Sequence, residues 1–480
     1  MAGLSLLDAI IVFGYLAAMV GIGFYTLRRK KDVDDYYVGG RKCGTFAIGC
    51  LWMASWIGGA TVVGSTDKAY SLGVAALWYC GSMAVGCVLF AVTSTGLIQK
   101  VGTKFLALTY PELIEKRYGP AARLMAAVTT FLAYVAYTAG QFLAMATILS
   151  GITGWDMTAC IWFSAVSMVV YTAIGGFIAV AITGVAQAVI IVLTLSLLMA
   201  PLLVIKAGGP ANIYQTLPPS FFDFGSWGWG RTIGMTVTII LTFYTSMDSY
   251  TRCFASRSEE VARKGTLFAA ALVGLVAVST ITIGLAAKVL NPDLPEGASV
   301  MNAMMLILPD GVKGLILIGL LAAIMSTGSV CLLVASANIT HDAYKRFLNP
   351  GASSSSLVLL GGVSAVVVGG LSVYLAISRQ DIIDVLYIAF TVNSAGLFVP
   401  TLAALVWRKG GAAAGAWSIG LSLLTVVAWY AGQSLAPESR LFAVDPVWPG
   451  LIVSAVVFLV CSRLMPLQIQ DQRRLAEFWG

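Results

Sequence analysis

One stretch of the sequence is central to the fold: Gly314-Leu-Ile-Leu-Ile-Gly-Leu-Leu-Ala-Ala-Ile-Met-Ser-Thr-Gly-Ser-Val-Cys-Leu-Leu-Val-Ala-Ser-Ala-Asn-Ile339. It contains no charged residue and is long enough to cross a bilayer as a helix. Within it, Ala323, Ser326 and Thr327 occupy positions i, i+3 and i+4 and therefore share one helix face. Hydroxyl groups at membrane depth either bond to their own or a neighbouring helix or join other oxygens around a hard cation. Taken alone, this run is open to both interpretations, helix packing and cation binding.

The composition of the whole chain is that of an integral membrane protein. Hydrophobic residues make up 59% of the 480 residues, charged residues only 11%, and the mean hydropathy is +0.88. The surface of a water-soluble domain could not tolerate this composition. Long, uniformly apolar runs also exclude a β-barrel, whose strands alternate over about ten residues. We find thirteen such runs, at 6–27, 45–70, 75–98, 124–150, 156–178, 184–206, 232–254, 265–288, 313–341, 356–377, 383–407, 413–433 and 448–465.

The positions of lysine and arginine predict the orientation of these spans. If the N-terminus lies outside, 22 of the 29 basic residues fall on the inside and six on the outside, with Lys68 near the outer end of a span. We therefore predict an N-out, C-in topology. The net charge of +7 is then a topology signal, and no nucleic-acid partner is expected. The first run lacks a basic segment before it and is expected to be an uncleaved extra span.

Two connections have distinctive compositions. The connection at 207–230 is rich in proline, phenylalanine and tryptophan, which suits a loop or short helix at the membrane interface or an outer lid. The connection at 99–122 is expected to contain a short helix, with Pro111 at its first position.

An internal correspondence appears when the first span and the last two are set aside. Ten spans remain, and two halves of five must have opposite orientations because five is odd. The first helix of one half is interrupted by Gly58 and Gly59, and the first helix of the other by a polar string at 242–249. Interrupted helices at corresponding positions of inverted halves indicate a transport site. Glycines that only allow close packing, and an Asp248 that only pairs with Arg252, are the alternatives.

Six short motifs in order carry a family resemblance. They are Asp34-Asp35-Tyr36-Tyr37-Val38-Gly39-Gly40-Arg41, Tyr171-Thr172-Ala173-Ile174-Gly175-Gly176-Phe177-Ile178-Ala179-Val180, Arg252-Cys253-Phe254-Ala255, Ala322-Ala323-Ile324-Met325-Ser326-Thr327, Ile339-Thr340-His341-Asp342-Ala343-Tyr344 and Trp407-Arg408. Together with the spans, they resemble the sodium:solute symporters, the family of sodium/glucose, sodium/proline, sodium/pantothenate and sialic acid transporters.

The resemblance implies an all-α membrane protein with a LeuT-like inverted repeat of five plus five helices. Residues 6–27 would form an extra N-terminal helix, 45–206 the first repeat and 232–407 the second. Residues 413–465 would form two trailing helices, and 466–480 a cytoplasmic tail. The whole chain is then a single transporter domain in the cell membrane, or in the inner membrane of a Gram-negative bacterium.

The resemblance also implies a sodium site between the broken first core helix and the eighth. Glycines favour unwinding just after Ile57, and unwinding frees backbone carbonyls at membrane depth. All the implied ligands are uncharged oxygens, which suits a monovalent ion that must be released. They are the backbone carbonyls of Ala54, Ile57 and Ala323 and the hydroxyls of Ser326 and Thr327.

A second sodium site, present in some members, is not expected in this chain. Those members carry an aspartate after a threonine in the fifth core helix and extra serines in the eighth. Here Gly184 follows Thr183, and Val330 follows Ser329. We therefore predict one coupling sodium per transport cycle.

The family pattern places the substrate beside the first break. Tyr137 and Gln141 share a helix face, and Gln141 is costly to expose to lipid. Trp56 stands where proline-transporting members carry an aspartate, which argues against proline. No lysine or arginine lies mid-span in these helices, which argues against a dianionic solute. The implied substrate residues are Ser55, Trp56, Gly59, Tyr137, Gln141, Tyr244, Ser246 and Asn393.

The leading hypothesis is sodium-coupled symport of a small organic solute by alternating access. A membrane enzyme is excluded by the shortage of mid-span acid–base groups, since the one histidine, His341, lies at the end of a span and is expected to interact with the helix C-terminus. A proton-coupled transporter and a transporter-like sensor remain alternatives. The expected partners are sodium, the solute and the bilayer, with no obligate protein partner; the solute itself stays open among monocarboxylates, amino acids, vitamins and sugars.

Overall fold

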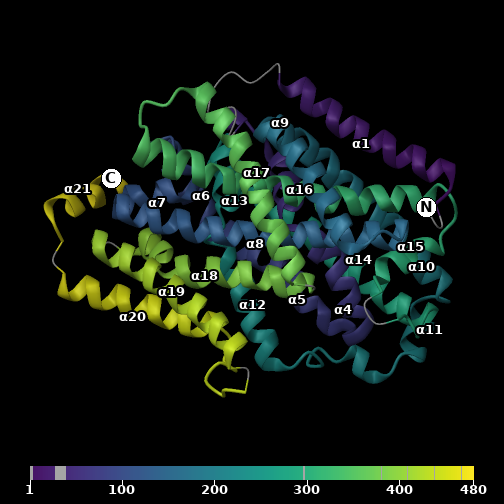
Figure 1. Ribbon diagram of the computed structural model, residues 1–480. Coiled ribbons are helices and arrows are strands. Elements are labelled where there is room, and N and C mark those ends of the chain that lie inside the picture. The colour runs from purple at the N-terminus through teal and green to yellow at the C-terminus, as the bar shows by residue number, and fades with distance from the viewer. Residues whose placement is uncertain are drawn as a thin grey trace.

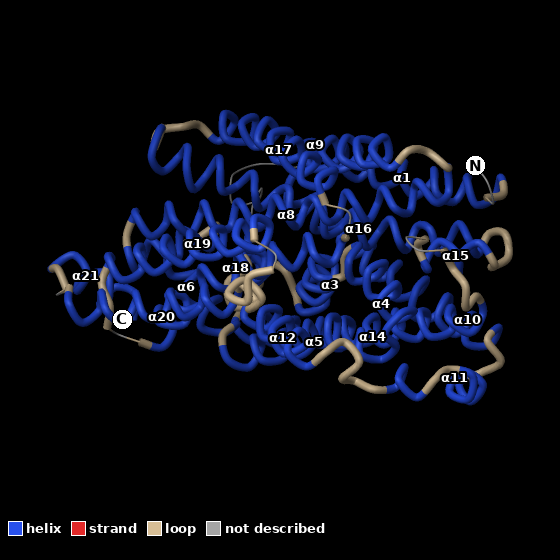
Figure 2. Tube along the Cα trace, turned by 60° about the horizontal axis from the view of Figure 1, so that its bottom comes forward, coloured by secondary structure: helices blue, strands red, loops and turns tan. Residues whose placement is uncertain are grey.

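The computed structural model describes residues 4–27, 39–295, 298–379, 381–407, 409–436, 438–465 and 467–479. Over these ranges the regular structure is helical, and the elongated helices lie side by side in a bundle (Figure 2). Most of the motif at 34–41 lies outside the described residues.

The first part of the chain, up to residue 222, contains the extra N-terminal helix and the first predicted repeat. Its elements are α1 (Leu6–Leu27), η1 (Gly39–Arg41), α3 (Thr45–Trp56), η2 (Ala60–Gly64), α4 (Ser65–Leu72), η3 (Gly73–Ala76), α5 (Leu77–Thr93), α6 (Thr95–Phe105), α7 (Tyr110–Tyr118), α8 (Pro120–Thr153), α9 (Met157–Ile191), η4 (Val192–Met199), α10 (Ala200–Lys206), α11 (Pro210–Thr216) and η5 (Pro219–Phe222).

The rest of the chain contains the second predicted repeat and the trailing helices. Its elements are α12 (Trp229–Phe243), α13 (Met247–Ala255), α14 (Glu259–Leu290), α15 (Val300–Leu306), α16 (Val312–Ala337), η6 (Asn338–Leu348), α17 (Ser354–Ser378), α18 (Ile382–Val406), α19 (Ala412–Leu435), α20 (Val447–Leu464) and α21 (Ile469–Trp479).

Both predicted helix interruptions are confirmed. The α3 helix ends at Trp56, and Ile57 leaves the helical conformation with φ −89° and ψ 79° before η2 and α4 continue the span. The α12 helix ends at Phe243, and α13 begins again at Met247 after three residues outside either helix. Each half of the chain therefore begins with a helix that is broken near its middle.

The segment from α9 to α10 cannot run straight. Gly328 packs against Met168, and Gly319 packs against Thr194. A straight helix would separate residues 168 and 194 by about 39 Å, whereas residues 319 and 328 lie only about 14 Å apart along α16. The segment therefore bends between its two contacts with α16, and the two separate spans at 156–178 and 184–206 stay a prediction.

The helices outside the two halves lie at the edges of the bundle. Figure 1 shows α1 at one edge and α19 with α20 at the opposite edge, while α8 crosses the middle. The α1 helix packs on α9 and α16, and the α19–α20 pair packs on α18. This placement suits additions to a central core.

Nine described helices are long and apolar enough to cross a membrane, and Leu6–Met19, Thr45–Trp56 and Met157–Val170 are shorter apolar helices. The count of thirteen spans, their orientation and the division into repeats stay predictions.

The connection at 99–122 contains a short helix, as expected, but the helix begins at Tyr110 and Pro111 is its second residue. Thr109 caps α7, because its hydroxyl accepts a hydrogen bond of 3.2 Å from the backbone N–H of Glu112, and Pro111 stands in the first turn. The α7 helix thus marks one end of the bundle, called here the α7 end, at which α3 begins and α13 ends.

Candidate functional site

The first helix break is wedged between α8 and α16. The backbone N–H of Gly59 donates a 2.7 Å hydrogen bond to Oε1 of Gln141 on α8. A Cβ on Gly58 would lie 2.7 Å from that same oxygen and 2.9 Å from Oγ1 of Thr327 on α16. Only residues without a side chain allow both helices to approach the interrupted backbone this closely.

Four of the five predicted sodium ligands pair up beside this break. Thr327 Oγ1 donates a 3.1 Å hydrogen bond to the carbonyl oxygen of Ala54, which joins α16 to α3. Ser326 Oγ donates a 3.0 Å bond to the carbonyl of Ala323 within its own helix. The fifth, Ile57, is the residue at which α3 leaves the helical conformation. Ser326 and Thr327 are 1% and 6% exposed, so their uncharged oxygens fit a small monovalent cation shielded from bulk water.

A central cavity adjoins these oxygens. Its volume is about 40 Å³, well below the usual range for small-molecule sites of about 300–1,000 Å³, so the surrounding helices would have to move apart to admit a solute. Thr327 lines this cavity, and its hydroxyl also bonds to Ala54, so this residue belongs both to the cavity and to the predicted sodium ligands. Its lining residues are Ser55, Trp56, Gly58, Thr61, Tyr79, Met83, Tyr134, Tyr137, Gln141, Ser246, Asp248, Thr327, Val330, Cys331, Leu386 and Phe390.

Five of the eight predicted substrate residues line this cavity, namely Ser55, Trp56, Tyr137, Gln141 and Ser246. The other three lie outside its lining. Gly59 contributes the backbone bond to Gln141, and Asn393 Nδ2 donates to Ser246 Oγ at 3.3 Å. Tyr244 points elsewhere: its hydroxyl lies 2.9 Å from Thr93 Oγ1.

The sequence interpretation missed the carboxylate of this cavity. The hydroxyl of Tyr134 donates a hydrogen bond to Asp248 Oδ1, and the backbone N–H of Asp248 donates back to that hydroxyl at 3.2 Å. The alternative for Asp248 was a pair with Arg252, but the Arg252 guanidinium donates to Ser55 Oγ at 2.6 Å. Tyr134 could have been found, because it lies on the same α8 face as Tyr137 and Gln141.

Aromatic rings form one wall of the cavity. Trp56 stacks on Phe243 with ring centroids 3.7 Å apart and faces Phe390 at 6.0 Å. Tyr137 meets Phe390 edge-on at 5.1 Å and Tyr134 at 5.1 Å. These contacts hold the rings in fixed orientations around the cavity.

The cavity is closed toward the α7 end. On that side of the cavity, the Arg252–Ser55 hydrogen bond joins α13 to α3. Farther along, the backbone of Cys43 accepts from Arg257 at 3.2 Å and donates to Ala255 at 3.0 Å, which ties the start of α3 to the end of α13. Toward the opposite end, Lys68 and Asp381 form an ion pair of 3.5 Å in a polar vestibule, and Ile383 packs against Gly64.

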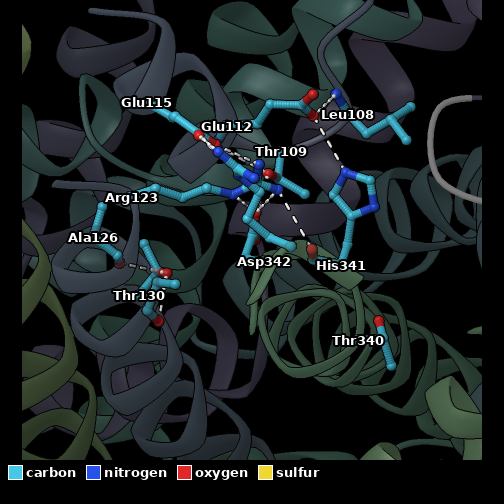
Figure 3. Close-up of polar contacts among 12 residues, drawn as sticks. Leu108, Thr109, Glu112, Glu115, Arg123, Ala126, Thr130, Thr340, His341 and Asp342 are labelled. Carbon is cyan, nitrogen blue, oxygen red and sulfur yellow. Dashed lines mark hydrogen bonds and ion pairs between the residues drawn. The ribbon is translucent and has the colours of Figure 1, made fainter. Parts of the chain in front are cut away.

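A buried ion-pair network holds the α7 end together (Figure 3). Arg123 on α8 lies 2.8 Å from the Asp342 carboxylate on η6 and 2.7 Å from Glu115 on α7. His341 Nε2 lies 3.3 Å from Glu112 Oε2 on α7, and the expected interaction of His341 with its own helix C-terminus stays a prediction. Burial works to raise the pKa of Glu112, but its hydrogen bond and charge interaction with His341 prevail and lower it to about 2.

Comparisons with known proteins identify the family. The model of the sodium:solute symporter family matches residues 36–421. The chain belongs to this family. Curated relatives include the sodium/proline symporter of Haemophilus influenzae, 26% identical over 95% of this chain and 94% of the relative. The sodium/proline symporter of Escherichia coli is 27% identical over 94% and 91%.

Solved structures show the fold. A Na⁺-coupled sialic acid symporter in a substrate-bound outward-open state aligns over 96% of this chain and 98% of that one, with a TM-score of 0.80 at 21% identity. Mhp1, a nucleobase-cation-symport-1 family transporter, aligns over 92% and 98% with a TM-score of 0.56 at 15% identity. The chain is therefore a helical membrane transporter with LeuT-like neighbours, coupled to sodium, and not an enzyme.

Proposed function

We propose that this protein imports a small organic solute together with one sodium ion by alternating access. The observation that carries the proposal is the position of Thr327, whose hydroxyl contacts the Ala54 carbonyl and also lines the central cavity. An ion bound to these oxygens would hold the Thr327 side of the cavity in place, and the solute would bind against that side. Sodium would then raise the affinity for the solute, and the solute would raise the affinity for sodium by the same factor.

The proposed ion site consists of the carbonyls of Ala54, Ile57 and Ala323 and the hydroxyls of Ser326 and Thr327. The hydroxyls already lie within hydrogen-bonding distance of two of these carbonyls, at 3.1 and 3.0 Å. Turning both hydroxyl hydrogens away would present their oxygens to a cation entering between α3 and α16. Because the set is uncharged, it favours sodium over a proton, which generally needs a titratable group.

A single ion per cycle is supported by the surroundings of Gly184. A Cβ on Gly184 would lie 3.3 Å from Leu51 and 3.6 Å from Ala54, so the position faces α3 next to the proposed ligands. Glycine places no carboxylate there. Counting sodium and solute fluxes in the same vesicles tests this point, and two sodium ions per solute would overturn it.

The proposed topology places the α7 end inside the cell, on the side that receives 22 of the 29 basic residues. The vestibule with Lys68 and Asp381 then faces outward. Each sodium ion that enters gains about 2.3 kcal/mol per 100 mV of membrane potential, which can drive solute accumulation.

Solute uptake into proteoliposomes tests the function directly. A panel of labelled amino acids, monocarboxylates, vitamins and sugars is offered with an inward sodium gradient, with an inward proton gradient and with neither. We expect sodium-stimulated uptake of at least one solute. Stimulation by protons alone would favour the proton-coupled alternative, and the absence of any uptake by folded protein would overturn symport.

The double variant Ser326→Ala with Thr327→Ala tests the ion site. It should lose sodium dependence while the protein still inserts and folds. A matched control is Ser336→Ala with Thr266→Ala, which also removes two buried hydroxyls that bond to their own helices, at 2.7 and 2.8 Å. Equal loss of sodium dependence in both double variants would show that hydroxyl packing, and not ion binding, is measured.

A further inference from the structure

The central cavity contains one charged lining residue among those described, Asp248. It is buried, at 5% exposure, and comes from α13, the helix that begins after the second break. A buried carboxylate is costly unless it meets donors or a positive charge. The hydroxyl of Tyr134 supplies one donor to Oδ1. A cavity that keeps a carboxylate at its wall is suited to a ligand that carries positive charge.

Arg252, the positively charged residue nearest to Asp248 in sequence, makes its contacts outside the central cavity. Arg252 lies one turn along α13 and attracts Asp248 electrostatically. Its guanidinium, however, bonds to Ser55 and lines a separate small cavity toward the α7 end, together with Thr251 and Ala337. Arg252 therefore offsets part of the cost of burying Asp248 without occupying the central cavity. The carboxylate is the charge that a solute in this cavity would meet.

Aromatic side chains line the same space. Trp56, Tyr79, Tyr134, Tyr137 and Phe390 all line the cavity. The faces of such rings carry negative potential and attract a desolvated cation. A sugar could donate hydrogen bonds to the carboxylate but brings no charge to it or to the rings, and the carboxylate of a simple acid would be repelled by it. An ammonium group would interact through its charge with both.

Two buried donors in the cavity wall are poorly bonded. Trp56 Nε1 lies near the Asp248 carboxylate and the Tyr137 hydroxyl near Ser246, but neither makes a hydrogen bond of good geometry, although these side chains are only 7% and 8% exposed. Buried donors without partners are unfavourable and mark places where a ligand or water completes the bonding. Acceptor oxygens on the solute would satisfy them. The cavity thus offers a carboxylate for a cation and donors for an anion within one space.

We infer that the transported solute is a small zwitterion whose ammonium group binds Asp248 within the ring of aromatic side chains. Its carboxylate then faces Tyr137 and the Thr327 side of the cavity, where the coupling ion would lie. This inference rests on the proposed symport and adds to it the chemical class of the solute and the residue that selects it. Among the open classes it favours amino acids over sugars and monocarboxylates.

Matched solute pairs test the inference on the unaltered protein. Each pair shares a carbon skeleton and a carboxylate but differs in the amine: alanine with lactate, proline with cyclopentanecarboxylate, and valine with 2-hydroxyisovalerate. Uptake into proteoliposomes is measured with and without a sodium gradient. For the best pair, we expect the amine member to be taken up with at least tenfold higher apparent affinity.

The outcomes separate the two levels of the argument. Sodium-stimulated uptake that prefers the member without an amine, or a sugar, overturns the zwitterion inference and leaves symport intact. No sodium-stimulated uptake of any solute by folded protein overturns symport and the inference with it.

Asp248→Asn tests the residue. We expect at least a tenfold loss of affinity for the amine-bearing solute, while sodium binding, measured with radioactive sodium on purified protein, changes less than twofold. The matched control is Asp445→Asn, because Asp445 also accepts a hydrogen bond from a tyrosine, Tyr387, at 2.6 Å but lies outside the central cavity. The control should leave both affinities unchanged.

Two results would overturn the assignment of Asp248. One is wild-type solute affinity in Asp248→Asn, and the other is loss of sodium binding, which would place Asp248 in the ion site. If Asp248→Asn does not fold, Asp248→Glu decides the matter, because it keeps the charge and lengthens the side chain. This variant should retain the preference for amines but favour smaller solutes, and loss of that preference would contradict the assignment.

Discussion

The hydroxyl of Thr327 on α16 lies 3.1 Å from the carbonyl oxygen of Ala54 on α3 and donates a hydrogen bond to it. The two residues are 273 positions apart in sequence and belong to the two halves of the chain. The Ala54 carbonyl lies in the last turn of α3, immediately before the helix break, where carbonyls lose their intrahelical partners. The contact therefore links the halves at the point where an ion could take the place of a hydrogen bond.

Replacing Thr327 by valine should separate ion binding from packing. Valine has nearly the same shape but no hydroxyl, so the contact with Gly58 and the cavity wall is kept. We expect sodium affinity, measured as the sodium dependence of uptake, to fall at least tenfold in Thr327→Val and to stay within a few-fold in Thr327→Ser. If valine supports normal sodium dependence, the hydroxyl is not a ligand.

Gly59→Ala should impair folding and transport more than Gly274→Ala, another glycine substitution in the membrane core. The added Cβ would overlap the Cβ of Ala144 and lie 3.3 Å from Ile324. Overpacking of this kind costs about 1–3 kcal/mol. Gly274→Ala is the control, because its Cβ would meet Ala84 at an ordinary 3.9 Å. Thermal unfolding in detergent compares the two, and equal melting temperatures would contradict the tight fit at the break.

The sequence predicts local features of this molecule well and distant pairs poorly. The span at 6–27 coincides with α1, and both helix breaks lie at the predicted glycines and polar string. These features follow from short windows of hydropathy and from residues that cannot continue a helix. The contacts Tyr134 to Asp248 and His341 to Glu112 join residues 114 and 229 positions apart. Such pairs depend on how the helices pack, and no local pattern of a single sequence encodes them.

The α7 end should lose stability in acid because of Glu112. Its pKa of about 2 in the folded protein lies below the ordinary value of 4.5, so its contribution is fully present above about pH 4.5 and is lost as the pH falls toward 2. A shift of this size corresponds to an upper limit of about 3 kcal/mol. The melting temperatures of wild type and Glu112→Gln should differ at pH 6, approach one another below about pH 4.5 and converge near pH 2. A difference that is independent of pH would contradict the charged contact with His341.

Arg123 should matter far more to stability than an exposed arginine with a similar partner. Its contact with Asp342 is buried, with side chains 5% and 0% exposed. Removing one partner of such a pair leaves an uncompensated charge and costs about 3–5 kcal/mol. Arg231 pairs with Asp384 at 3.1 Å, but both are more than half exposed, and such a pair contributes about 1 kcal/mol or less. Unfolding of Arg123→Met and Arg231→Met compares them, and similar stabilities would refute a structural role for the buried network.

Ser55→Ala should weaken the closure between the central cavity and the α7 end. Ser55 Oγ accepts a 2.6 Å hydrogen bond from Arg252, and this bond joins α3 to α13 between the two cavities. Without it, the guanidinium loses a buried partner and the closed arrangement loses roughly 1.5–3 kcal/mol, the usual worth of a hydrogen bond to a charged group. The state open toward the α7 end should then become more populated.

A cysteine introduced at Ala337, which lines the smaller cavity, should react faster with a hydrophilic maleimide in Ser55→Ala than in the parent protein. Ser279→Ala is the control, because Ser279 Oγ bonds only to the carbonyl of Leu275 on its own helix, at 2.7 Å, and should leave the reaction rate unchanged. Equal rates in all three proteins would show that the Arg252 to Ser55 contact does not hold the cavity closed.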